Sequence, residues 1–279
     1  MKSYTASTYD ADEIVRELLD GAGAVRFEGL FTDQQIADAR TIIMEHSSVE
    51  NPKVTHFQGK AEDDGKLNLQ RRVWNLLAKG DVFSDMAAHP VLMDVLAKFL
   101  GTEFIMGSIA ANRILPGGPG QEPHVDYPYW DMHDLASHPT RLNASFPVNA
   151  QVTIMLDPFT AKSGATAFMP GTQKNLRYPT EADNFFENCD RMLGKPGDTI
   201  LFFGAAWHCA MPNTSDNERN AVLTNYLPKW VKPLEDLPAG LSADFMNNAS
   251  CEIRQLIGLN HPYPEVLDTA KAGNTEGRT

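Results

Sequence analysis

The spacing of hydrophobic positions in the first hundred residues predicts helices joined by short extended segments. In DADEIVRELLDG (10–21) the apolar residues share one helical face, and glycines follow where the helix should end. The alternation in AVRFEGLF (24–31) predicts a strand, after which Thr32 is placed to cap a helix over TDQQIADARTIIMEH. HPVLMDVLAKFLG (89–101) predicts another amphipathic helix. These elements together predict a helical layer in the N-terminal part of the chain.

Two stretches between these elements are less regular. Residues 51–66 are polar and contain glycine, which predicts a loop and a candidate flap, since mobile loops commonly close over binding sites. RVWNLLAKG (72–80) predicts a helical or irregular segment.

Beyond residue 104 the pattern changes to short β-type runs separated by glycine and proline. The runs are EFIMGSIAANRIL (103–115), HVDYPYW (124–130), AQVTIMLD (150–157), ATAFMP (165–170), DTILFF (198–203) and AVLTNYLPKWV (221–231). Short strands without long helices between them predict an antiparallel sandwich or barrel. We therefore predict a single domain, mainly β with flanking helices. It comprises a helical N-terminal layer (1–104), a β core (105–230) and a C-terminal extension and tail (231–279).

Composition places the chain among globular proteins. It has 279 residues, 42% hydrophobic and 22% charged, enough for a substantial core. No run approaches the roughly 18 apolar residues of a membrane span, and the N-terminus has no apolar signal segment, so we expect no membrane association. Three cysteines (Cys189, Cys209 and Cys251) share no CxxC spacing, which argues against a disulfide framework and favours the reducing cytoplasm.

The net charge is −12, with acidic and basic residues interspersed. Binding to a nucleic-acid backbone requires a basic surface, so we expect no nucleic-acid partner. The charge is compatible with a site for a small molecule.

One of the eight histidines stands in an H-x-D pair, formed by His124 and Asp126. Residues i and i+2 of a strand project to one face, so the imidazole and the carboxylate can bind one metal ion. Two histidines and one carboxylate with open positions are the ligand set of non-haem Fe(II) oxygenases. Taken alone, the pair also fits an ordinary hydrogen-bonded pair in a loop.

The remaining groups for such a site lie in GDTILFFGAAWHCAMPNTSDNER (197–219). His208 follows an apolar strand, and Arg219 comes eleven residues later. A buried arginine near an open metal site is what a bidentate carboxylate ligand would require. Singly, His208 also fits a core histidine and Arg219 a surface charge. His133 and His138 combine acid and imidazole at similar spacing, but in a loop-like context, so we assign them to the pocket rim at most.

Four ordered blocks of the sequence resemble the phytanoyl-CoA dioxygenase family of Fe(II)/2-oxoglutarate-dependent oxygenases. The blocks are GAGAVRFEGLFTDQQIADAR (21–40), HVD (124–126), SGATAFMPGTQK (163–174) and GDTILFFGAAWHCAMPNTSDNERNAVLTNY (197–226). The resemblance covers roughly residues 10 to 230. It implies a double-stranded β-helix, a distorted jelly roll, with iron in its mouth.

The resemblance also implies cofactors and roles. His124, Asp126 and His208 would hold Fe(II) and form the catalytic centre, and Arg219 would pair with the distal carboxylate of 2-oxoglutarate. O2 would be the second cosubstrate, with succinate and CO2 as co-products. QEPHVD resembles the Q-x-x-H-x-D form of members that act on fungal alkaloids and meroterpenoids, which implies that Gln121 helps to hold 2-oxoglutarate.

Further positions follow from the same resemblance. Thr166 stands where the cosubstrate is often hydrogen-bonded, and QRRVWNL resembles an R-R-x-x-N-L segment that would put Arg72 and Asn75 near the substrate. Two departures are visible. Ala210 replaces a frequent serine, so any cosubstrate contact of that serine must come from another group, and Gln173 replaces a histidine outside the iron set.

Three aromatic residues, Tyr127, Tyr129 and Trp130, directly follow the predicted metal ligands. They fit core packing and also fit an apolar wall that binds the substrate.

These observations predict an oxygenase that oxidises, most simply hydroxylates, a C–H bond of a small organic molecule, in specialised metabolite biosynthesis. A catabolic hydroxylase of a phosphonate, an amino-acid derivative or a fatty acyl group is an alternative, as is a non-catalytic jelly-roll binding protein. A metal-dependent hydrolase or isomerase would also use such a metal site, but would not need Gln121 or Arg219. The sequence leaves monomer and homodimer open.

Overall fold

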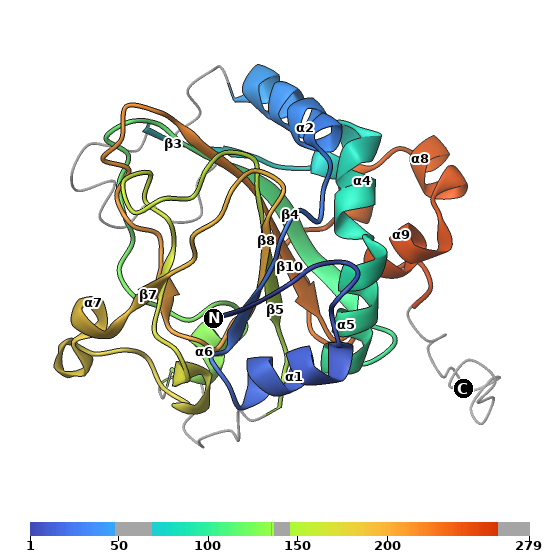
Figure 1. Ribbon diagram of the computed structural model, residues 1–279. Helices are drawn as coiled ribbons and strands as arrows, with labels where there is room; N and C mark the ends of the chain where they lie inside the picture. The colour runs from blue at the N-terminus through green and yellow to red at the C-terminus, as the bar shows by residue number, and fades with distance from the viewer. Residues whose placement is uncertain (48–68, 135, 137–145, 262–279) are drawn as a thin grey trace, which may run out of the picture.

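The computed structural model describes residues 1–47, 69–134, 136 and 146–261, and its largest feature is a seven-stranded sheet (Figure 1). The strand order is β1-β2-β8-β5-β10-β4-β3, and neighbours are antiparallel except β1 and β2, which are parallel. The strands are β1 (Lys2–Tyr4), β2 (Ala24–Phe27), β3 (Gln70–Val73), β4 (Ile105–Ile114), β5 (Ala150–Met155), β8 (Thr199–Phe203) and β10 (Arg219–Leu227). The candidate flap at 51–66 lies outside the described residues.

A smaller antiparallel sheet lies across the interior from the large one. Its order is β7-β6-β9, with β6 (Ala167–Phe168), β7 (Asp190–Arg191) and β9 (His208–Cys209). The two sheets, antiparallel apart from the β1–β2 pair, enclose a common interior and form the predicted distorted jelly roll, which confirms the fold class.

Helices such as α4 (Asp81–Ala87) and α5 (Pro90–Leu100) cover the face of the large sheet that points away from β7, whereas α7 (Phe185–Asn188) lies on the same side as β7 (Figure 1). The helices are α1 (Ala11–Leu19), α2 (Asp33–His46), α4 (Asp81–Ala87), α5 (Pro90–Leu100), α6 (Tyr129–Met132), α7 (Phe185–Asn188), α8 (Ala243–Asn248) and α9 (Cys251–Leu256). Short 3-10 turns are η3 (Leu76–Ala78), η4 (Thr172–Lys174), η5 (Glu181–Asp183) and η6 (Pro238–Gly240). Phe99 of α5 packs edge-on against Phe203 of β8, with ring centroids 5.2 Å apart, and so joins the helical layer to the sheet.

The helices begin where the sequence predicts. Thr32 caps α2 in a capping box with Gln35, and Asp10 caps α1 by accepting hydrogen bonds from the backbone of Asp12 and Glu13. Pro90 occupies the first turn of α5, where its missing N–H costs nothing.

The structure differs from the sequence prediction at three places. Gln70–Val73 is an edge strand, because its backbone pairs with Ala111–Ile114 of β4. Tyr129–Met132 is a helical turn, because the backbone N–H of Tyr129 and of Trp130 turns back to the carbonyl of Asp126. Lys2–Tyr4 forms β1. The N-terminal layer therefore contributes three strands to the large sheet as well as helices.

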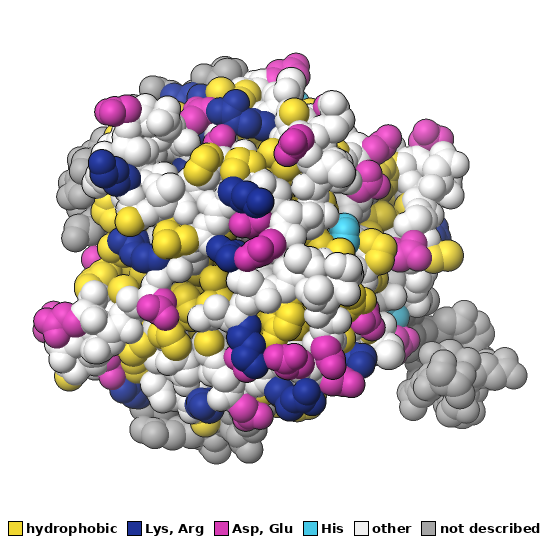
Figure 2. Space-filling model, viewed as in Figure 1, with side chains coloured by type: hydrophobic (Ala, Val, Ile, Leu, Met, Phe, Trp, Pro, Cys, Tyr) yellow, Lys and Arg dark blue, Asp and Glu magenta, His cyan; other side chains and the backbone are white. Residues whose placement is uncertain are grey.

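The surface agrees with the charge pattern of the sequence. Acidic and basic side chains are interspersed, with apolar side chains between them, on the face seen in Figure 2. None of the helices in the described ranges is long and apolar enough to span a bilayer.

Candidate functional site

The fold brings His124, Asp126 and His208 together, although 84 residues separate the outer two. His124 and His208 face each other in an isolated β-bridge, with N–H···O distances of 2.9 and 3.1 Å in the two directions. The backbone N–H of Asp126 donates to the carbonyl of Gly204 at 2.8 Å and continues this pairing. One ligand atom from each of the three side chains lies within 4.8 Å of the others.

Both imidazole rings are oriented by backbone carbonyls. Nδ1 of His124 lies 2.7 Å from the carbonyl oxygen of Glu122, and Nδ1 of His208 lies 2.9 Å from that of Ala206. A carbonyl only accepts, so each Nδ1 carries the hydrogen and donates it. The Nε2 atoms therefore face Asp126, at 3.8 Å from His124 and 3.2 Å from His208, and each can offer its lone pair to a metal ion once it carries no proton. This outer support is typical of histidines that bind metals.

The protonation equilibria of the three groups are coupled. Burial, with the nearby His208, lowers the pKa of His124 to about 4, so this ring is neutral at neutral pH. Burial also acts on His208, but the Asp126 carboxylate outweighs it and raises the pKa of His208. Burial alone would raise the pKa of Asp126, yet the histidines and a hydrogen bond from Gln151 lower it.

The three side chains open into a cavity of about 310 Å³ between the two sheets. Its wall follows alternate positions of β10, namely Arg219, Ala221, Leu223 and Asn225, as the two-residue period of a strand requires. The other lining residues are Arg72, Trp74, Ser108, Ala110, Asn112, Gln121, Tyr127, Trp130, Gln151, Thr153, Phe159, Thr166, Phe202, Ala210 and Leu234.

Arg219 is a buried cation at one end of this cavity, 3% exposed. Its guanidinium lies over the ring of Phe159, 4.7 Å from the centroid, and donates to the carbonyl of Gly164. Burial, with the charges of Arg72 and Arg191, lowers its pKa to about 10, so it stays charged at neutral pH. Within the described ranges no carboxylate forms an ion pair with Arg219.

Gln121 and Thr166 also lie in the cavity wall. The side-chain oxygen of Gln121 accepts the backbone N–H of Ala210 at 3.1 Å, which joins the segment before His124 to the segment after His208. Ala210, which replaces the serine of the resemblance, lines the cavity beside it.

Arg72 is the second cation of the cavity. Burial lowers its pKa to about 10, and the negative charge of Asp126 partly opposes this effect. The charge of Arg72 also acts on Arg219, so its guanidinium lies in the cavity wall within the electrostatic reach of both groups. Tyr127, Trp130 and Trp74 provide aromatic wall, and the rings of Tyr127 and Trp130 meet edge to face at 5.5 Å. Arg72, Tyr127 and Trp130, which the sequence analysis predicts to bind the substrate, thus line the cavity.

Two predicted substrate-binding residues lie outside the cavity wall. Tyr129 is fully buried in the core: its ring packs on Phe203, and its hydroxyl accepts the N–H of Val148 at 2.9 Å. The side-chain amide of Asn75 donates to the carbonyl of Gly240 at 2.7 Å and so holds the C-terminal extension instead. Both predictions of a cavity position are corrected, because α6 places the Tyr129 ring in the core and the Asn75 side chain binds the backbone of the C-terminal extension.

The two other candidate histidines do not join the site. His133 packs edge-on against Tyr178 and does not line the cavity, and His138 lies outside the described residues.

Sequence reasoning missed Leu234 of the C-terminal extension, together with Gln151 and Asn112. The alternation along β4, β5 and β10 could have indicated the inward-facing strand positions. Leu234 has no such signal, because its place depends on how the extension docks. Glu235 fixes it there, accepting the N–H of Asn75 and of Ile109 at 3.1 Å each.

The residues present fit a divalent metal ion and a dicarboxylate. Two Nε2 atoms and one carboxylate form an open ligand set of the kind used by non-haem iron, and the outer carbonyls hold both rings in the binding tautomer. Arg219, a buried cation whose guanidinium has no carboxylate partner in the described ranges, matches the geometry of a carboxylate.

Comparison with known sequences identifies the family and several relatives. The family model of phytanoyl-CoA dioxygenase (PhyH) matches residues 19–221. Dioxygenase af480 of Aspergillus fumigatus is 24% identical over 197 residues, which cover 68% of this chain but only 59% of that protein. Dioxygenase cdmA of Talaromyces verruculosus is 25% identical over 241 residues, 80% of this chain and 75% of that protein.

Solved structures share the fold. The non-haem alpha-ketoglutarate-dependent epimerase SnoN from nogalamycin biosynthesis aligns with a TM-score of 0.59 at 14% identity, over 83% of this chain and 91% of that chain. Its complex with Fe3+, alpha-ketoglutarate and nogalamycin RO aligns with a TM-score of 0.57 at 14% identity, over 78% and 84% of the two chains.

Proposed function

The chain belongs to the phytanoyl-CoA dioxygenase family and is a non-haem Fe(II)/2-oxoglutarate-dependent oxygenase, and from this premise we propose that it hydroxylates a C–H bond of a small organic molecule in specialised metabolite biosynthesis. The Q-x-x-H-x-D form around Gln121 supports this substrate class. So does the structural neighbour from nogalamycin biosynthesis.

We assign the site as follows. His124, Asp126 and His208 hold Fe(II) and form the catalytic centre. Arg219 pairs with the distal carboxylate of 2-oxoglutarate, with Gln121 and Thr166 beside it. Bound iron and 2-oxoglutarate supply the oxidation with O2, releasing succinate and CO2.

The protein's own contribution is orientation and exclusion of water. Tyr127 and Trp130 offer flat apolar surfaces against which a substrate can pack, and Arg72 offers a donor to a polar group of the substrate. The cavity lies between the sheets, so a substrate that enters it displaces water from the metal face.

The observation that carries the proposal is Arg219 in the same cavity as the His–Asp–His cluster. Burying a guanidinium is costly unless an anion meets it. Neither a metal-dependent hydrolase nor a binding protein for a neutral ligand would explain why the Arg219 guanidinium is buried.

The test is an anaerobic titration of the apo-protein with Fe(II) and 2-oxoglutarate, monitored by the visible charge-transfer band of a chelated 2-oxo acid. We expect the band in the wild type and in His133→Ala, whose histidine lies outside the cavity wall. We expect none in His208→Ala. A screen of small molecules for succinate release, with product mass by mass spectrometry, then identifies the substrate and the outcome.

The alternatives give different results. Iron binding without a band favours a metal-dependent hydrolase or isomerase, and no metal binding favours a non-catalytic binding protein. A band followed by succinate release only with phosphonates, amino-acid derivatives or fatty acyl groups favours a catabolic hydroxylase.

A further inference from the structure

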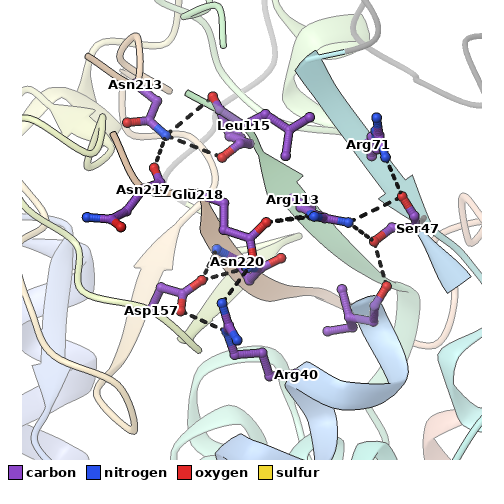
Figure 3. Close-up of polar contacts among 12 residues, drawn as sticks. Arg40, Ser47, Arg71, Arg113, Leu115, Asp157, Asn213, Asn217, Glu218 and Asn220 are labelled. Carbon is purple, nitrogen blue, oxygen red and sulfur yellow. Dashed lines mark hydrogen bonds and ion pairs between the residues drawn. The ribbon is translucent and has the colours of Figure 1, made fainter. Parts of the chain in front are cut away.

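The residues on either side of Arg219 enter a polar network on the outer face of the sheet (Figure 3). Glu218 accepts from two arginines on different elements: Arg40 of α2 at 2.8 Å, and Arg113 of β4 at 2.8 Å from Nε and 2.7 Å from Nη2. Successive strand residues point to opposite faces, so Glu218 and Asn220 lie outside the sheet while Arg219 lies in the cavity.

Asp157, just after β5, forms the second half of the network. Its carboxylate accepts Nε of Arg40 at 3.0 Å, and it accepts the backbone N–H and the side-chain amide of Asn220 at 2.9 and 2.6 Å. The amide of Asn220 also reaches Glu218 at 3.2 Å. The backbone is therefore held on both sides of Arg219.

The same turn supports the guanidinium inside the cavity. Phe159, whose ring lies under Arg219, follows Asp157 by two residues. The Asp157 carboxylate thus connects the strand that carries Arg219 to the turn that carries Phe159.

The network is balanced in charge and largely shielded from water. Arg113, Asp157 and Glu218 expose 11%, 13% and 17% of their side chains, and only Arg40 is more open, at 41%. The two acidic side chains, Asp157 and Glu218, thus form ion pairs with two arginines. Charge-assisted bonds of this kind are short and directional, and removing one partner leaves the others buried without a match.

We propose that Glu218 is a positioning residue, which through Arg40, Arg113 and Asn220 sets the place of the Arg219 guanidinium for the distal carboxylate of 2-oxoglutarate. The proposal rests on the assignment of Arg219 made above. A shift of the guanidinium weakens the carboxylate pair but leaves the chelation of a metal ion untouched.

The experiment compares two 2-oxo acids in the anaerobic titration of the Fe(II)-loaded full chain. 2-Oxobutyrate chelates through the same two groups as 2-oxoglutarate but lacks the distal carboxylate. We expect Glu218→Gln to weaken 2-oxoglutarate binding by roughly tenfold. We expect it to leave 2-oxobutyrate and Fe(II) affinities within about twofold. In an Arg219→Ala background, Glu218→Gln should have no further effect on either acid.

Two further variants accompany the test. Arg40→Gln leaves Glu218 paired with Arg113, so its effect should have the same direction and be smaller, and it serves if Glu218→Gln does not fold. Lys98→Gln removes an exposed ion pair with Asp12 in the same helical layer and should change neither affinity.

Other outcomes overturn the proposal. Equal loss for both acids would make the network a support of the fold around the metal rather than of Arg219. Loss that persists in the Arg219→Ala background would have the same meaning. No loss for either acid would show that Glu218 does not position Arg219 at all. If Arg219→Ala itself binds 2-oxoglutarate normally, the cosubstrate assignment fails first, and the positioning role fails with it.

Discussion

At the scale of single residues, the metal-binding face depends on which ring nitrogen carries the hydrogen. The carbonyls of Glu122 and Ala206 take the Nδ1 hydrogens of His124 and His208, so both lone pairs point inward. The sequence predicts the three residues through their spacing and the family resemblance. It does not predict the tautomer, because the accepting carbonyls belong to backbone whose path depends on the bridge between two distant segments.

Arg72 provides a prediction at this scale. If it contacts the substrate, as assigned, Arg72→Gln should raise the substrate KM by about tenfold, the loss expected for a hydrogen bond to a charged group. The affinity for 2-oxoglutarate should stay within about twofold. Steady-state kinetics with the substrate found by the succinate screen, together with the anaerobic titration, separate the two effects.

The opposite pattern of effects on the substrate KM and on 2-oxoglutarate affinity would contradict the assignment of Arg72 to the substrate. An unchanged substrate KM with weaker 2-oxoglutarate binding would place Arg72 on the cosubstrate side, which the effect of its charge on Arg219 also permits. Arg72→Lys keeps the positive charge but loses the planar guanidinium, and so tests whether paired hydrogen bonds from Arg72 are needed.

At the scale of elements, the N-terminal cap of α2 is expected to contribute to the free energy of unfolding. Thr32 accepts the N–H of Gln35 at 3.3 Å, and Gln35 accepts the N–H of Thr32 at 3.0 Å. Thr32→Ala should lower the free energy of unfolding by about 1 kcal/mol. Thr41→Ala, an exposed position in the same helix, should leave it nearly unchanged or slightly higher, since its hydroxyl only bonds back to Ala37. Urea denaturation measures both, and equal losses would refute the capping role.

The docking of the C-terminal extension gives a pH-dependent prediction. Burial raises the pKa of Glu235 above its ordinary value of 4.5, although bonds from Ile109 and Asn75 partly oppose it. The folded state therefore holds this proton more tightly than the unfolded state, and the contribution of Glu235 to stability falls as pH rises through that range. The stability of Glu235→Gln relative to wild type should accordingly increase between pH 4 and pH 7.

Urea denaturation of both proteins at several pH values tests this sign. Other titrating groups cancel in the difference between the two proteins. A difference that is constant, or that moves in favour of wild type as pH rises, would show that the two N–H bonds outweigh the burial of the carboxylate.

Elements with a strong local signal could be predicted from the sequence, and elements fixed by distant partners could not. The capped helices α1, α2 and α5 follow from residues within each helix. Gln70–Val73 becomes a strand only because the edge of β4 is there to pair with it. Tyr129 likewise becomes a core residue because the chain turns at Asp126; Pro128 marks a break in the strand pattern but does not indicate which side chains then face the core.

At the scale of the whole molecule, the candidate site connects parts of the chain that fold into different sheets. β10 contributes Arg219 from the large sheet, β9 contributes His208 from the small one, and the loop after β4 contributes His124 and Asp126. The order of these groups along the chain made the site predictable through the family resemblance. The cavity itself, with its wall from the C-terminal extension, required the three-dimensional structure.

This connection predicts that cofactors stabilise the whole fold. Fe(II) and 2-oxoglutarate bind only when both sheets are assembled, so binding should raise the free energy of unfolding by about 2.7 kcal/mol at 100 times the dissociation constant. For a chain of this length that is roughly 5–10 °C in the unfolding midpoint, measurable by anaerobic thermal scanning. A chelator should reverse the shift, and His208→Ala should abolish it, while His133→Ala should retain it. A wild-type midpoint that does not move with saturating Fe(II) and 2-oxoglutarate would mean that the three side chains do not bind the metal as one site.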